Sequence, residues 1–272
     1  MFKAAVCAAA LAFVTPAFGI TGAAHAQALK PIRVIMVGDS TMTDKSGYGI
    51  GFCAQFNPEV TCINLSRGGR SSKSYRVEGL WDKALDQIRD GKGFAKTYVW
   101  IEWAHNDGSD KPERHTDIHN EFPLNMRHYG DDIAAAGATP IMATPLTQRW
   151  FLNGKLRPDL LPWANAIRTV AHDKHWEVVD FYAESQKAVQ DMGPVAANRM
   201  AGDPIPQNIL DSEASGTSVP AVFTDASQGT TASHQGFDYT HLGAKGSAYF
   251  GKMAADLWAS QDPDIRPYVK AE

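Results

Sequence analysis

The sequence has 272 residues and a formal net charge of −4, with 26 Lys and Arg against 30 Asp and Glu. This mildly acidic balance argues against nucleic acid as a general partner, although a local basic patch could still bind an anionic substrate. A chain of this length can bury about three quarters of its unfolded surface in one domain or a tight pair of domains.

The first 26 residues are typical of a secretory signal peptide. Lys3 gives a positive start, residues 4–20 are mainly apolar, and residues 24–26 (Ala-His-Ala) form a small-x-small cleavage site. A membrane anchor is the alternative, but Pro16 and Gly19 would break a spanning helix. We therefore expect a secreted or periplasmic protein whose residues 27–272 form a single domain, without a membrane anchor.

Residues 32–37 (Ile-Arg-Val-Ile-Met-Val) are almost entirely apolar and rich in branched side chains, as in a strand that is buried on both faces. The run ends at Gly38-Asp39-Ser40, where small and turn-forming residues predict a sharp exit from the sheet. Ser40 would then lie at the carboxyl edge of the sheet, where open α/β proteins bind ligands. The alternative is that Asp39 or Ser40 only caps the next helix.

Strands and helices alternate along the rest of the chain. Four further strands are predicted, at residues 60–65, 97–103, 139–144 and 176–180. Helices are predicted at residues 47–56, 79–88, 122–136, 162–175, 181–190 and 242–260. This alternation predicts a parallel sheet with helices on both faces. In the first helix, Ile50 and Phe52 are expected to face the core.

Residues 191–236 depart from this pattern. They are rich in Gly, Pro, Ser, Thr and Ala, show little apolar periodicity, and are longer than a simple connection. We expect a long loop insertion, which is either a functional loop over the site or a partly disordered segment.

Cys53 and Cys62 are nine positions apart in a chain that we expect to be exported. A disulfide that closes a short loop between a helix and the next strand is the favoured interpretation. A catalytic thiol or a metal-binding pair is the alternative, but no neighbouring residue supports either.

A set of polar residues follows the predicted strands and precedes the last helix. Acyl transfer by a serine needs a nucleophile, a base, a carboxylate that orients the base, and donors for the oxyanion. Ser40 would be the nucleophile, His241 the general base, and Asp238 the carboxylate. The backbone N–H groups of Ser40 and Gly69, with the side-chain amide of Asn106, would form the oxyanion hole.

The four segments that carry these residues resemble, in order, the four blocks of the SGNH (GDSL-type) hydrolases. Residues 38–42 (Gly-Asp-Ser-Thr-Met), residues 69–75 with Gly-Arg-Ser and Ser-Tyr, and residues 105–108 (His-Asn-Asp-Gly) are similar to the rhamnogalacturonan acetylesterase branch. The resemblance implies a flavodoxin-like, three-layer αβα sandwich with a five-stranded parallel sheet. It also implies release of acetyl groups from cell-wall polysaccharides without a metal or other cofactor.

The chain departs from the family pattern in two places. Ala104 replaces a residue that is usually Gly before His105, which could shift the turn of Asn106. The stretch 191–236 is longer than expected, which puts the substrate in doubt.

Five histidines, at positions 105, 115, 119, 128 and 241, raise the possibility of a metal site. His115 and His119 would face together on a helix, but the residues between them form no zinc motif, and the segment 109–119 has the composition of a surface loop. We therefore expect solvated histidines there and no metal.

The segment beside Gly69 is basic, with Arg67, Arg70, Lys73 and Arg76. Because arginine matches carboxylates geometrically, one of these cations, with Arg70 as the candidate, could bind a uronate of a pectic substrate. Alternatively, they form a solvated loop paired with acidic neighbours.

The sequence thus predicts an exported serine esterase that acts on an acetylated polysaccharide or oligosaccharide of the rhamnogalacturonan or pectin type. An alternative is the same chemistry on acetylated xylan or other acyl esters. A second alternative, of another class, is a carbohydrate-binding protein that has lost catalysis.

Overall fold

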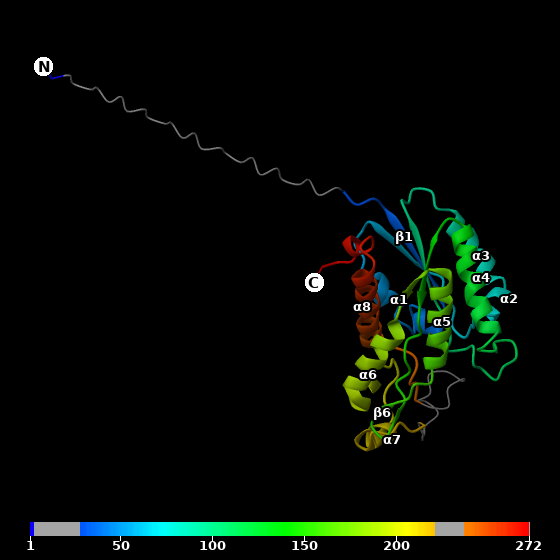
Figure 1. Cartoon of the computed structure of the whole chain (residues 1–272). Coiled ribbons are helices and arrows are strands. Elements are labelled where there is room, and N and C mark those ends of the chain that lie inside the picture. The colour runs from blue at the N-terminus through cyan, green and yellow to red at the C-terminus, as the bar shows by residue number, and fades with distance from the viewer. Residues whose placement is uncertain (3–27, 221–236, 272) are drawn as a thin grey trace.

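The computed structural model has a central five-stranded parallel sheet with the strand order β2-β1-β3-β4-β7 (Figure 1). The structure describes residues 1–2, 28–220 and 237–271, so most of the predicted signal peptide and the segment 221–236 lie outside the described residues. Each predicted strand is present within one residue of its expected ends. The strands are β1 (Ile32–Gly38), β2 (Val60–Asn64), β3 (Thr97–Glu102), β4 (Thr139–Ala143) and β7 (Glu177–Val179).

The central strand β1 pairs with β2 on one side and β3 on the other, and all of its residues are buried. Side chains alternate between the two faces of a strand. Val34 and Met36 accordingly pack on one face, and Ile35 and Val37 pack on the other. This two-sided burial explains why the strand is apolar throughout and does not alternate with polar residues.

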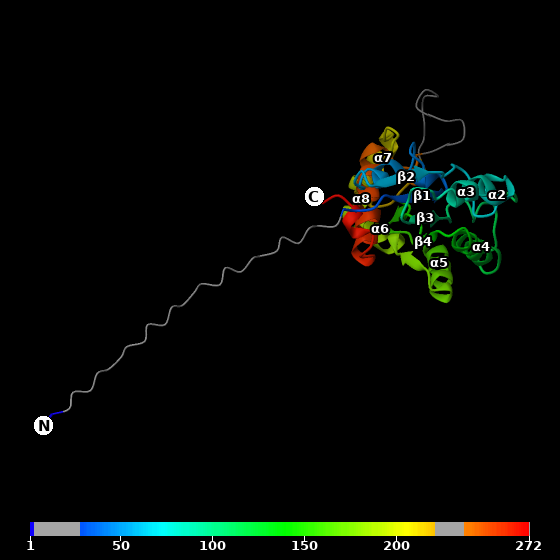
Figure 2. The ribbon, with the colours of Figure 1, turned by 90° about the horizontal axis from the view of Figure 1, so that it is seen from above.

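Three helices cover the face of the sheet on which Val34 and Met36 lie (Figures 1 and 2). Trp258 lies at the centre of this layer, fully buried and in ring contact with Phe52, Phe56, Tyr98 and Trp100. The helices are α1 (Gly49–Cys53), α6 (Phe181–Asn198) and α8 (Ala244–Gln261).

The opposite face is covered by a second helical layer, with Ile35 and Val37 in its core (Figure 1). The helices of this layer are α3 (Leu80–Arg89), α4 (Glu121–Ala135) and α5 (Leu161–Lys174), with the short α2 (Ser74–Val77) preceding α3. In α3 the buried residues are Trp81, Ala84, Leu85 and Ile88, which have the spacing of one helical face.

The predicted three-layer αβα architecture is therefore confirmed. In this strand order, the chain leaves the central strands β1 and β3 toward opposite faces, so a crevice opens at their carboxyl ends. Ser40 follows β1 and Asn106 follows β3, so both lie at this crevice. No helix among the described residues is long and apolar enough to span a membrane.

The expectation that Ile50 faces the core is wrong, because Ile50 is 57% exposed while Phe52 is fully buried. The reason is the close crossing of α1 and α8. A Cβ atom added at Gly251 would come within 2.3 Å of the Gly51 backbone. This contact buries the face of α1 that carries Gly51 and Phe52 and turns Ile50 to the outside.

The segment after residue 190 is more regular than expected. α6 extends to Asn198, with a break at Gly193 (φ 68°) before Pro194, and α7 (Gln207–Ser212) follows. The expectation of an irregular loop is therefore wrong for residues 191–198 and 207–212. Gly193 and Pro194 interrupt the helical signal locally, but the turns on either side still form helices because they pack against the domain.

Two further features connect neighbouring segments. The predicted disulfide is present and joins Cys53, at the end of α1, to Cys62 in β2, with a Cα–Cα distance of 5.6 Å. A short antiparallel hairpin that the sequence did not predict follows β4, formed by β5 (Phe151–Leu152) and β6 (Lys155–Leu156).

Candidate active site

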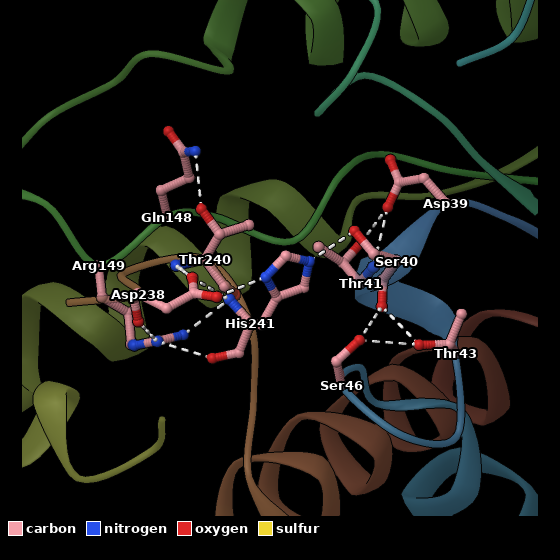
Figure 3. A network of polar contacts seen from close by, with 10 residues as sticks. All are labelled: Asp39, Ser40, Thr41, Thr43, Ser46, Gln148, Arg149, Asp238, Thr240 and His241. Carbon is pink, nitrogen blue, oxygen red and sulfur yellow. Dashed lines mark hydrogen bonds and ion pairs between the residues drawn. The ribbon is translucent and has the colours of Figure 1, made fainter. Parts of the chain in front are cut away.

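The turn that carries Ser40 is fixed by its own backbone and by short polar side chains (Figure 3). Asp39 caps a single 3₁₀ turn, because its carboxylate accepts a hydrogen bond from the Thr41 N–H at 2.9 Å. The carbonyl oxygen of Ser40 accepts hydrogen bonds from the hydroxyl groups of Thr43 (2.9 Å) and Ser46 (3.2 Å). Ser40 therefore stands on a rigid turn, with its Oγ directed toward His241.

Ser40, His241 and Asp238 form a continuous hydrogen-bonded relay (Figure 3). His241 Nε2 lies 2.6 Å from Ser40 Oγ, and His241 Nδ1 lies 2.6 Å from an oxygen of Asp238. The other oxygen of Asp238 accepts the backbone N–H groups of Thr240 (2.8 Å) and His241 (2.9 Å). The carboxylate thus fixes both the ring and the backbone of His241.

The electrostatics of this relay favour an ionised Asp238 and a more basic His241. Burial raises the pKa of Asp238, but its hydrogen bonds and the charge of His241 lower it by more, so that it lies well below the usual range. Burial lowers the pKa of His241, but the hydrogen bond and charge of Asp238 raise it by more, so the net pKa is above the ordinary value. A histidine of this kind can take a proton from a hydroxyl and hold it.

The oxyanion-hole candidates lie on the loops after β2 and β3. Gly69 has a left-handed backbone (φ 74°), which a glycine adopts without strain, and a Cβ placed on neighbouring Gly68 would be 3.6 Å from the Ser40 Cβ. Among the described residues, the backbone N–H groups of Ser40 and Gly69 donate to no other protein group. Both are therefore available to a ligand.

Asn106 reaches the same region from the loop after β3. One N–H of its amide donates to the carbonyl oxygen of Arg70 at 3.0 Å, which leaves the second N–H for another acceptor. The turn closes in spite of Ala104, whose carbonyl accepts the Asp107 N–H at 3.0 Å.

Asp107 connects the loops of Gly69 and Asn106. Its buried carboxylate accepts the hydroxyl groups of Ser72 (2.5 Å) and Thr116 (3.1 Å) and the backbone N–H of Ser72. Burial raises the pKa of Asp107 to about 7, although these hydrogen bonds oppose the increase. The sequence alone does not indicate this role for Asp107, because its partners are far away along the chain.

A buried acid lies beneath the Ser40 turn and was not expected from the sequence. Glu102, at the end of β3, has no exposed surface and accepts hydrogen bonds from the Tyr48 hydroxyl (2.5 Å) and the Leu146 N–H (3.2 Å). The Thr41 hydroxyl lies 2.8 Å from Asp39 and 3.1 Å from Glu102. Burial and the charge of Asp39 raise the pKa of Glu102 to about 8.

A cavity of about 470 Å³ adjoins the relay, and Ser40, Asn106 and His241 are among the residues that line it. Trp150 and Tyr239, also in its wall, pack edge to face with ring centres 4.7 Å apart. The Ser40 hydroxyl therefore faces a space that can hold one or two sugar rings.

Most cations of the basic segment beside Gly69 are paired with carboxylates. Arg70 contacts Glu78 at 2.9 and 3.0 Å, Lys73 contacts Glu121 at 3.3 Å, and Arg76 contacts Asp132 at 3.0 Å. Arg67 and Arg114 form no ion pair within the described part of the chain. The Arg114 guanidinium lies 3.4 Å from a Cβ built on Gly69, so the unpaired charge closest to Gly69 comes from a different loop.

His115 and His119 lie on the exposed loop between β3 and α4, and neither shares a site with His241. Across residues 28–220 and 237–271, no group of three or more His, Cys, Asp or Glu side chains is arranged to hold a metal ion.

The chain is similar in sequence to curated carbohydrate esterases. The chain is 28% identical to the rhamnogalacturonan acetylesterase RhgT of Bacillus subtilis over 63% of this chain and 74% of RhgT. It is 26% identical to the rhamnogalacturonan acetylesterase of Emericella nidulans over 79% of this chain and 80% of that protein. These named homologues support the resemblance to the SGNH hydrolases. They identify the chain as a carboxylic ester hydrolase, as the four sequence blocks predicted.

Solved structures share the fold of this chain at low sequence identity. The crystal structure of YxiM from B. subtilis aligns with a TM-score of 0.60 and 16% identity, covering 86% of this chain and 57% of YxiM. A structure described as a GDSL-like lipase from Parabacteroides merdae aligns with a TM-score of 0.55 and 12% identity, covering 84% of this chain and 95% of that one. No protein-family model matches the chain.

Proposed function

We propose that this protein is a secreted carbohydrate acetylesterase that uses Ser40, His241 and Asp238 as its catalytic triad. The observation that carries the proposal is the relay from Ser40 through His241 to Asp238, with two hydrogen bonds of 2.6 Å at the wall of a sugar-sized cavity. The sequence similarity to rhamnogalacturonan acetylesterases supports an acetylated, pectin-like polysaccharide as the substrate.

The first half of the reaction acylates the enzyme. Ser40 Oγ attacks the acetyl carbonyl carbon while His241 Nε2 takes the hydroxyl proton, and the carbonyl oxygen becomes an oxyanion. The N–H groups of Ser40 and Gly69 and the free amide N–H of Asn106 stabilise this charge. His241 then gives the proton to the departing sugar oxygen, which leaves acetyl-Ser40 and a free sugar hydroxyl.

The second half regenerates the enzyme by the same route. A water molecule loses a proton to His241 and attacks the acetyl carbonyl, and the oxyanion forms in the same hole. His241 returns the proton to Ser40 Oγ, and acetate is released. Asp238 keeps the Nδ1 proton on His241 throughout and stabilises the imidazolium that forms in each half.

A cation near the reaction centre supports a uronate-containing substrate. Arg70, expected from the sequence for this role, already shares its charge with Glu78. Arg114 lies against Gly69 and has no carboxylate partner among the described residues, so its guanidinium can pair with a substrate carboxylate. We therefore assign uronate binding mainly to Arg114, with Arg70 in a supporting role.

Acetate release from a panel of acetylated polysaccharides tests the function. Wild type and Ser40→Ala would be compared on acetylated rhamnogalacturonan, acetylated xylan and 4-nitrophenyl acetate, with Ser260→Ala, at an exposed position of α8, as the matched control. We expect the pectic polymer to be preferred, all turnover to vanish in Ser40→Ala, and Ser260→Ala to behave as wild type. Activity on xylan or small esters alone would remove the pectin assignment. Sugar binding without turnover would instead indicate a carbohydrate-binding protein.

A further inference from the structure

Arg149 is buried beside the proposed triad, on the loop between β4 and β5 (Figure 3). Only 1% of its surface is exposed. Its guanidinium donates to three backbone carbonyl groups of one loop, those of Asp238 (2.8 Å), Thr240 (3.2 Å) and His241 (2.8 Å). Its own backbone N–H donates to the carbonyl of Tyr239 at 2.9 Å. A single residue thus binds the backbone of all four residues from 238 to 241.

The loop that receives these hydrogen bonds has no regular structure of its own, because residues 237–243 precede α8 and belong to no helix or strand. On its C-terminal side it is held by the Leu242 N–H, which donates to Ser46, and by the Gly243 N–H, which donates to Met200. On the side of Asp238 and Thr240, contacts with other segments include Arg149, the Gln148 amide, which donates to the Thr240 hydroxyl at 3.0 Å, and the Tyr239 hydroxyl, which donates to the Val219 carbonyl at 2.8 Å. Arg149 binds the backbone carbonyls of both Asp238 and His241, so it helps to set the position of one relative to the other.

Burying the Arg149 guanidinium costs desolvation free energy, because moving a charge out of water is strongly unfavourable unless hydrogen bonds or an opposite charge compensate it. Here the acceptors are carbonyl groups, not a paired carboxylate side chain. Burial lowers the pKa of Arg149 to about 10, while the charge of Asp238 opposes this change, so the guanidinium is still ionised at neutral pH. Its positive charge acts on the relay as well as on the loop.

We propose that Arg149 is a positioning residue for the esterase reaction: it fixes the loop 238–241 so that His241 stays between Asp238 and Ser40. This inference rests on the proposed function. Four charged or titratable groups surround the imidazole, namely Asp238, Asp39, Arg149 and His105. The two carboxylates raise the pKa of His241, and Arg149 lowers it.

Two variants separate the geometric and electrostatic parts of this role. Arg149→Lys keeps the positive charge but cannot reach three carbonyls with a planar fork. Arg149→Met loses both the charge and the hydrogen bonds. The matched control is Arg266→Met, because Arg266 also donates to two backbone carbonyls, those of Ala259 and Ser260, but does so at the end of α8, outside the residues that line the site.

Full pH profiles of kcat and KM on 4-nitrophenyl acetate test the proposal, with folding checked by circular dichroism. We expect both Arg149 variants to lose about 10- to 100-fold in kcat, as for a misplaced catalytic group, with KM changed less than about threefold. In Arg149→Met the acidic limb of the profile should also move to higher pH, because His241 no longer has a cation beside it. In Arg149→Lys this limb should stay in place, and Arg266→Met should match wild type.

The proposal is overturned if a folded Arg149→Lys keeps kcat within about twofold of wild type, or if Arg266→Met loses as much. If Arg149→Met does not fold, the kcat of Arg149→Lys decides. If wild type itself shows no Ser40-dependent turnover, the proposed function fails instead, and that result is seen before any Arg149 variant is measured.

Discussion

The backbone N–H of Leu242 donates to the carbonyl oxygen of Ser46 at 2.8 Å, and this hydrogen bond joins the two segments that carry His241 and Ser40. The two site residues are 201 positions apart in the sequence. Ser46 also binds the Ser40 carbonyl through its hydroxyl group, so the turn of the nucleophile and the loop of the base share one anchor. The hydrogen bond between Ser40 and His241 is therefore supported by the backbone geometry of both segments.

The role of Asp238 can be tested through its effect on the basicity of His241. Asp238→Asn should lower kcat/KM by about 10²–10⁴, because an amide neither fixes the tautomer of His241 nor stabilises the imidazolium. Asp238 raises the pKa of His241, so its loss should move the acidic limb of the pH profile to lower pH. Rates on 4-nitrophenyl acetate between pH 4 and pH 9 measure both effects. Asp211→Asn, at an exposed position of α7, is the control, and a profile unchanged in Asp238→Asn would exclude Asp238 from the triad.

Glu102 should make the stability of the protein depend on pH. Its pKa rises from 4.5 to about 8 on folding, so between these values the folded state holds a proton that the unfolded state releases. The free energy of unfolding should therefore fall as the pH rises from 4.5 to 8. Asp107 and Glu177, whose pKa values burial raises to about 7, contribute with the same sign.

Melting temperatures of wild type and Glu102→Gln from pH 5 to pH 8 test this linkage. We expect wild type to lose stability more steeply than Glu102→Gln across this interval, since a glutamine does not titrate. Glu113→Gln, on the exposed loop after β3, should run parallel to wild type. Equal slopes in wild type and Glu102→Gln would show that Glu102 does not bind the extra proton.

Arg114 and Arg70 offer a direct comparison of a free and a paired cation. On acetylated oligosaccharides with free uronates, Arg114→Gln should raise KM by about 5- to 20-fold. This factor corresponds to the loss of about one to two kcal/mol of binding free energy from one charge-assisted contact. Arg70→Gln should have a smaller effect, because Glu78 already compensates the charge of Arg70.

The same oligosaccharides with methyl-esterified uronates provide the control for charge. Wild type should bind them less well than the free acids, and this preference should disappear in Arg114→Gln. If Arg114→Gln keeps the preference for free uronates, Arg114 is not the carboxylate-binding residue. Ser40-dependent turnover in either case leaves the proposed reaction intact.

The Cys53–Cys62 disulfide should affect stability and not catalysis. It closes a loop of about nine residues between α1 and β2, and its removal should cost about 2–3 kcal/mol. For a domain of this size, that corresponds to a decrease of roughly 5–10 °C in melting temperature. Calorimetry of the Cys53→Ser, Cys62→Ser double variant checks the first part, with kcat expected within about twofold of wild type. A loss of activity in the folded variant would instead assign the cysteines to the site.

Local patterns were sufficient to predict each strand of the main sheet and the loops that follow. The apolar run at residues 32–37 and the turn at residues 38–40 are properties of neighbouring residues, so they can be recognised without the fold. The hairpin of β5 and β6 was missed because each of its strands has only two residues, too few to show a period. Ile50 was misplaced because a Gly–Gly contact between α1 and α8, far apart in the sequence, decides which side of α1 is buried.

The sequence by itself predicted the fold class, the resemblance to a known family, the cysteine pair and the candidates for nucleophile, base and oxyanion donors. These follow from residue types at short spacing and from the rule that parallel strands end at one edge of the sheet. Only the tertiary structure decided which charges are paired and which are free. Arg70 is paired with Glu78, Arg114 lies free against Gly69, Glu102 is buried beneath Ser40, and Arg149 binds the loop of His241. Burial and charge pairing depend on contacts between distant segments, and these form only when the chain has folded.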